Sequence, residues 1–92
     1  MNSKQQMPFI HVIKANHLRS HRIWLEFSDG FSGEIDLRSE LRGEVFEALK
    51  DPLYFGQFQI EGGTLTWPNS ADFAPEFLYD LAKHPVSQAK SY

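Results

Sequence analysis

The sequence predicts an α+β fold: one small domain of about five strands, with a three-stranded N-terminal meander, then a hairpin, short helices and a C-terminal helix packed on the sheet. Three observations predict it. Residues 22–27 alternate apolar and polar side chains and run into Ser28-Asp29-Gly30, a strong hairpin-turn signal. Gly62-Gly63 marks a second tight turn. A helical pattern of apolar residues follows Pro75.

The meander comes first along the chain. We expect a strand over Phe9–Ala15, a turn over Asn16–Ser20, a second strand over Arg22–Phe27 and a return strand over Phe31–Leu37. In the second strand one face is apolar and the other is polar except for a tryptophan; the two sets are Ile23, Leu25 and Phe27 against Arg22, Trp24 and Glu26. Such alternation is typical of a sheet with one buried and one solvated face.

The period changes to helical after residue 37. Apolar side chains at helical offsets predict helical turns over Arg38–Lys50, interrupted at Gly43. Asp51-Pro52 disfavours an unbroken helix, so we expect Leu53–Phe55 to form a separate turn. The last helix should run from Pro75 to about His84, or from Phe73 if the Asp72 side chain is its N-cap.

Length and composition limit the domain count and the class. The 92 residues suit one domain, which we place at 9–84, with flexible tails at 1–8 and 85–92. No cysteine is present, which excludes disulfides and thiolate metal sites and favours the cytoplasm. The net charge of −3 disfavours direct nucleic-acid binding, and no apolar run is long enough for a membrane span. We expect no cofactor.

Two patterns could indicate metal or acid–base chemistry. Glu34 and Asp36, with Glu26 opposite, could form a carboxylate cluster, but acids at alternate strand positions also keep a sheet face wet, and arginines are available as partners. His11, His17 and His21 lie close together, but their spacing fits no familiar ligand pattern. We therefore expect ion-paired acids, surface histidines and no metal site.

Four residues are candidates for partner binding: Trp24, Trp67, Asn69 and Asp72. The last three follow one another at a strand-to-helix corner, where they could form a recognition site. They could equally be structural, with Trp67 in the core, Asn69 in the turn and Asp72 at the cap. Trp24 lies on the polar strand face, so either another element covers it or it belongs to an exposed binding patch. The sequence leaves both alternatives open.

An ordered set of short motifs runs through residues 9–82: Phe27-x-Asp29-Gly30, Asp36-Leu37, Leu49-Lys50-Asp51-Pro52, and Leu65-x-Trp67 followed by Asn69, Ala71 and Asp72. With these motifs the chain resembles the small bacterial family known as domain of unknown function 2442 (DUF2442). The resemblance implies a small α+β fold without established catalysis. Ser70 stands where an Asn-Gly-Ala-Asp corner would have Gly, so we expect an altered turn there.

The resemblance also implies a class of partner. Some members look like stand-alone chains encoded beside a second small protein, the domain of unknown function 4160, in toxin–antitoxin-like pairs. Others look like the N-terminal half of proteins that end in a helix-turn-helix. Too few residues follow Pro85 for that motif, so we do not expect a DNA-reading role to carry over.

These observations predict a non-enzymatic protein-interaction module, the antitoxin-like partner of a small protein encoded beside it. One alternative is a regulatory accessory domain that acts on nucleic acid through a partner or as an oligomer. A second is a small metal-assisted hydrolase that uses Glu34 and Asp36. The sequence leaves a homo-oligomer open.

Overall fold

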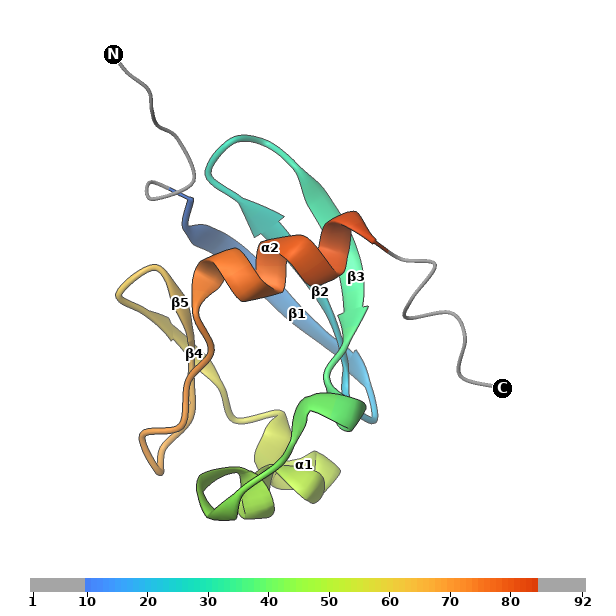
Figure 1. Cartoon of the computed structure of the whole chain (residues 1–92), viewed down its shortest axis with the longest axis vertical. Helices are drawn as coiled ribbons and strands as arrows, with labels where there is room; N and C mark the ends of the chain where they lie inside the picture. Colours follow the sequence, from blue (N-terminus) through green and yellow to red (C-terminus); the bar gives the residue numbers. More distant parts are fainter. Residues whose placement is uncertain (1–9, 85–92) are drawn as a thin grey trace.

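The computed structural model describes residues 10–84 and confirms the predicted α+β fold class. Three antiparallel strands form the main sheet in the order β1-β2-β3, with bounds Val12–Arg19, Arg22–Phe27 and Ser32–Asp36. A separate hairpin pairs β4 (Gln59–Glu61) with β5 (Thr64–Thr66). Figure 1 shows the C-terminal helix α2 (Pro75–Lys83) lying across the three-stranded sheet.

Short helical segments connect the two sheets, and each begins or ends where the sequence predicts a break. The segment after β3 contains two 3-10 helices, η3 (Arg38–Glu40) and η4 (Glu44–Lys50), separated at Gly43, which has φ 91°. Asp51 is extended, and its Oδ1 accepts a hydrogen bond from Leu53 N at 3.0 Å. This side chain therefore caps the single turn α1 (Pro52–Phe55).

The first strand differs from its prediction. We expected a strand over Phe9–Ala15 and a turn over Asn16–Ser20, but β1 continues to Arg19, and the turn is only Ser20 and His21. Asn16 pairs with Trp24 and His17 with Ile23. Pairing with β2 thus overrides the low strand propensity of a polar segment. Phe9 lies outside the described residues.

One face of the main sheet, which we call the inner face, forms the floor of the core. Ile23, Leu25, Phe27 and Ile35 are fully buried there, in one cluster with residues of α1, β5 and α2. A Cβ at Gly33 of β3 would lie 3.5 Å from Cβ of Ala82 in α2. The missing side chain lets α2 approach the sheet closely, so the predicted packing of the last helix on the sheet is confirmed.

Candidate interaction surface

The other face of the main sheet, the outer face, carries the polar side chains of the three strands. Cross-strand partners in an antiparallel sheet project on the same side, and the register aligns three rows across the sheet. The rows are Lys14–Glu26–Ser32, Asn16–Trp24–Glu34 and Arg19–Arg22–Asp36. None of these nine residues is buried, and none belongs to the hydrophobic core.

Trp24 lies in the middle row of the outer face, between Asn16 and Glu34. Its side chain is half-buried, yet it is not among the partly buried apolar residues that pack against the core. Among residues 10–84 it has no aromatic ring neighbour, whereas Trp67 has three. Trp24 is therefore a half-buried residue of the outer face, apart from the core cluster, and its role in binding stays a prediction.

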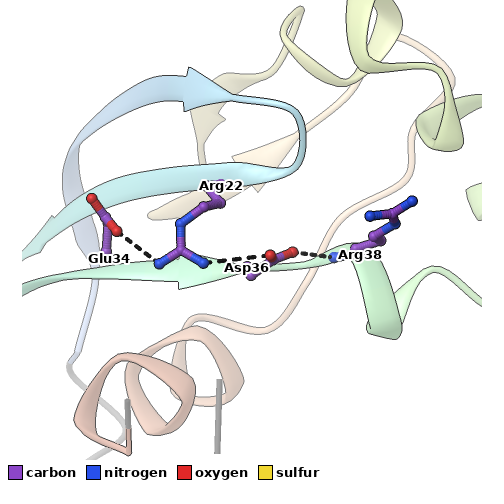
Figure 2. Close-up of polar contacts among 4 residues, drawn as sticks. All are labelled: Arg22, Glu34, Asp36 and Arg38. Carbon is purple, nitrogen blue, oxygen red and sulfur yellow. Dashed lines mark hydrogen bonds and ion pairs between the residues drawn. The ribbon is translucent and has the colours of Figure 1, made fainter. Parts of the chain in front are cut away.

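Arg22 forms ion pairs with Glu34 and Asp36, the two acids that could have formed a metal or acid–base site. Its Nη2 lies 2.7 Å from Oε1 of Glu34, and its Nη1 lies 3.4 Å from Oδ2 of Asp36. Figure 2 shows the guanidinium between the two carboxylates. The hydrogen bond to Glu34 is the largest cause that raises the pKa of Arg22. The expected ion-paired arrangement of Glu34 and Asp36 is confirmed.

Other polar contacts complete this face. Oδ1 of Asp36 accepts a hydrogen bond from Arg38 N at 2.9 Å, and Lys14 Nζ lies 3.9 Å from Oε1 of Glu26. Within residues 10–84, no three histidine or acidic side chains are grouped so that they could hold a metal ion. These contacts describe a solvated, ion-paired surface rather than a chemical centre.

Trp67, the second candidate tryptophan, lies in the core. It is 2% exposed, and its Nε1 donates a hydrogen bond of 2.7 Å to the Phe55 carbonyl. Its ring contacts Phe55, Phe58 and Phe73 at centroid distances of 5.5, 6.0 and 5.9 Å. Since the ring is buried and has three aromatic neighbours, Trp67 is part of the core packing.

Asn69 organises the corner after Trp67. Its Oδ1 accepts from Ala71 N at 3.1 Å, and its Nδ2 donates to the Val45 carbonyl at 3.0 Å. Ser70 adopts φ 74°, so it takes the left-handed conformation that glycine would favour. The expected alteration of this turn was therefore wrong. Ser70 N donates a hydrogen bond of 2.8 Å to the Trp67 carbonyl, and Trp67 N donates one of 2.9 Å to the Ala71 carbonyl, so the turn is closed with Ser70 in the left-handed conformation.

Asp72, the fourth candidate, does not cap the last helix. The helix α2 begins at Pro75 after Ala74, with no side-chain cap, so the alternative start at Phe73 was wrong. The Asp72 backbone instead forms an isolated antiparallel bridge with Thr66. Its side chain is exposed. The structure therefore separates the four candidates: Trp67 lies in the core, Asn69 and Asp72 lie at the corner, and Trp24 lies on the far side of the sheet.

A polar cleft beside the same corner was not expected. It has a volume of about 310 Å³ and is lined by Gln57, Gln59, Glu61, Thr66, Trp67, Pro68 and Ser70. The sequence did contain a signal, because Gln57, Gln59 and Glu61 alternate with apolar residues and so share one strand face. Side-chain amides and one carboxylate provide hydrogen-bonding groups, but no further observation indicates a ligand.

The histidines differ from the prediction at one position. His11 and His17 are exposed as expected, but His21 is 5% exposed. Its Nε2 donates a hydrogen bond of 2.8 Å to the Leu49 carbonyl, and its ring lies 4.7 Å from that of Phe55. The prediction of a surface histidine was therefore wrong at His21, where the ring ties the first turn of the sheet to η4.

Within residues 10–84, fold and surface together define a small α+β domain whose main sheet has one face in the core and one polar, largely exposed face. The chain belongs to the family described as "Protein of unknown function (DUF2442)", whose model matches residues 12–84. No helix within residues 10–84 is long and apolar enough to cross a membrane.

One solved structure with this fold is that of NE0471 from Nitrosomonas europaea, described as a candidate DNA-binding protein. It has a TM-score of 0.72 and 22% sequence identity to this chain, and the match covers 86% of this chain and 52% of NE0471. The chain therefore spans about half the length of that protein. At this identity the similarity shows the fold alone. No curated protein matches the chain.

Proposed function

We propose that this domain is a non-enzymatic protein-interaction module and that the outer face is its binding surface. The observation that carries the proposal is the position of Trp24, a partly exposed tryptophan in the middle row of a charged sheet face and apart from the core. Tryptophan and arginine are enriched among the residues that dominate binding energy, and they act best near the centre of an interface. Trp24 and Arg22 are neighbours on this face.

We further propose that the partner is a small protein encoded beside this one and that the domain acts as the antitoxin-like member of the pair. Support comes from membership of the family and from the polar, largely exposed outer face. A cytoplasmic location is part of the proposal, and the absence of cysteine supports it. The absence of catalysis is supported by Glu34 and Asp36, which Arg22 engages as ion-pair partners.

Co-expression with the product of the adjacent gene tests the proposal. We expect the two proteins to co-purify after nuclease treatment and Trp24→Ser to abolish the association. Leu53→Ser is the matched control, since Leu53 is 82% exposed on α1 and also loses an apolar side chain. Loss of the partner from both variants, or from neither, would contradict the assignment of the outer face.

A second candidate function is a regulatory accessory role on nucleic acid through a partner or an oligomer. The favouring observation is that this fold makes up about half of a protein described as a candidate DNA-binding protein. Direct phosphate binding is disfavoured by the net charge of −3 and by the engagement of Arg22 with Glu34 and Asp36. Strongly salt-dependent binding of labelled DNA by the purified chain would favour this candidate.

A further inference from the structure

We infer that the outer face is self-complementary and that it binds the outer face of a second copy of this chain. The inference rests on the proposed function only in taking the outer face as a binding surface, and the second copy and the neighbouring gene product then compete for this face. The carrying observation is the order of charge across the sheet. The basic Lys14 and Arg19 lie on β1, the acidic Glu34 and Asp36 lie on β3, and β2 between them carries one charge of each sign.

A two-fold axis parallel to the strands would bring the basic β1 of one copy opposite the acidic β3 of the other. Rotation about such an axis between two stacked sheets places β1 of one copy over β3 of the other, and it does so at both ends of the interface. Two sheets that pack face to face keep their strands within about 30° of each other. In the twisted sheets β1 of one copy therefore still lies over β3 of the other. At each edge Arg19 then faces Asp36 of the other copy, Asn16 faces Glu34 and Lys14 faces Ser32. The two β2 strands face each other, so the two Trp24 side chains meet close to the axis, between a pair of Arg22 and a pair of Glu26 side chains.

The two-fold dimer would give contacts to side chains of the outer face that have few contacts within one copy. Within residues 10–84, the Arg19 side chain has no hydrogen bond or ion pair, and Lys14 Nζ lies 3.9 Å from Oε1 of Glu26. Trp24 has no aromatic neighbour among the same residues. A second copy would therefore gain a partner for Arg19 and cover Trp24 without breaking the Arg22 contacts to Glu34 and Asp36.

The edge strand β1 is poorly suited to the alternative of edge-to-edge pairing. Its register with β2 shifts between Val12 and Lys14 and again between His17 and Arg19. Bulges at both ends bend and twist the strand and interrupt the row of groups that a further strand would need. This irregularity disfavours pairing between two copies through the β1 edge.

The area of the outer face indicates how stable the proposed dimer should be. Three strands about 4.8 Å apart, with about six residues each at about 3.3 Å per residue, make a face of about 300 Å² before side-chain relief is counted. Even with that relief, the interface would be smaller than the ~800 Å² per partner of a standard complex. We therefore expect a weak dimer, weakened further by salt.

Sedimentation equilibrium of the purified chain over about 5–500 µM at low salt tests the inference. The wild type should dimerise with rising concentration, and Trp24→Ser should weaken the association at least tenfold. Two charge variants sharpen the test. In Lys14→Glu with Arg19→Glu, both edge strands are acidic. In Ser32→Lys with Glu34→Lys, β3 becomes net basic, while Asp36 still pairs with Arg22.

Each charge variant alone should be monomeric, and an equimolar mixture should form heterodimers because both strand contacts are then between opposite charges. Unfolding curves first establish that every variant folds. A wild type that stays monomeric at 500 µM, or a mixture that stays monomeric, overturns the inference. The proposed function is tested separately: binding of the neighbouring gene product that Trp24→Ser abolishes would stand even if no homodimer formed.

Discussion

The hydroxyl of Tyr79 donates a hydrogen bond of 2.6 Å to Oδ2 of Asp29, which joins the last helix to the turn between β2 and β3. The Tyr79 ring also lies 5.0 Å from Phe27 and 5.5 Å from Phe31. The bond holds the pKa of Asp29 below its ordinary value of 3.8 and the pKa of Tyr79 above its ordinary value of 10.0. Two residues 50 positions apart thus share one contact.

Tyr79→Phe should lower the thermal unfolding midpoint at neutral pH, and this difference should disappear at both pH extremes. Because folding depresses the pKa of Asp29, the stabilisation is present above pH 3.8 and is lost as pH falls through the folded pKa. Because folding raises the pKa of Tyr79, the stabilisation is present below pH 10.0 and is lost as pH rises through the folded pKa.

Thermal unfolding of both proteins between pH 2 and pH 12, on the order of one pH unit per step, measures this difference. Asp29→Asn is the matched control, since it keeps an acceptor at that position but removes the acid transition. A Tyr79→Phe difference that is constant across the whole range would contradict the role assigned to the bond.

Trp67→Ala should lower the free energy of unfolding by about 3–5 kcal/mol, as expected for a large aromatic side chain removed from a core. The change also leaves the Phe55 carbonyl without its donor. Trp24→Ala is the matched control and should cost about 1 kcal/mol or less, because that ring does not pack against the core. Urea unfolding followed by circular dichroism measures the free energy of unfolding of both variants. Equal decreases for Trp67→Ala and Trp24→Ala would contradict a core position for Trp67 and a surface position for Trp24.

Gly33→Ala should change stability by less than about 1 kcal/mol, whereas Gly33→Leu should cost about 1–3 kcal/mol. A Cβ at Gly33 meets the Ala82 carbonyl at 3.4 Å and Ala82 Cβ at 3.5 Å, which is ordinary contact. A longer side chain has no room beneath α2 and must push the helix off the sheet. Equal tolerance of both substitutions in urea unfolding would show that α2 is not seated on this residue.

Ser70→Gly should stabilise the protein slightly, by about 0–1 kcal/mol. Serine at φ 74° carries a conformational cost that glycine avoids, although glycine also raises the entropy of the unfolded chain. Ser70→Ala is the control, since it keeps the Cβ and should not stabilise. A stabilising Ser70→Ala together with a destabilising Ser70→Gly would show that backbone strain is not the governing effect.

The sequence predicted the elements whose signals are local. The Asp29-Gly30 and Gly62-Gly63 turns, the interruption at Gly43 and the Asp51-Pro52 break all depend on residues with particular backbone preferences, and each lies where expected. The end of β1 depends instead on pairing with β2, which residue preferences do not report.

Burial of individual side chains was harder to predict for a similar reason. Alternation placed Trp24 on the polar face correctly, but it could not show whether another element covered that face. His21 occupies a turn next to polar residues, and only the return of the chain at Leu49 and Phe55 buries its ring. Asp72 has the composition of a helix cap, but the Ala74-Pro75 start leaves it outside the first turn.

The position of α2 at the end of the described chain has a consequence for synthesis. The main sheet is complete once residue 36 has been made, but the helix that covers its inner face ends only at residue 83. At a ribosomal rate of about 5–20 residues per second, the nascent chain spends several seconds with Ile23, Leu25, Phe27 and Ile35 lacking their final cover. Apolar surface that stays exposed during synthesis makes a chain prone to aggregate, so these strands should be safer once α2 has been made.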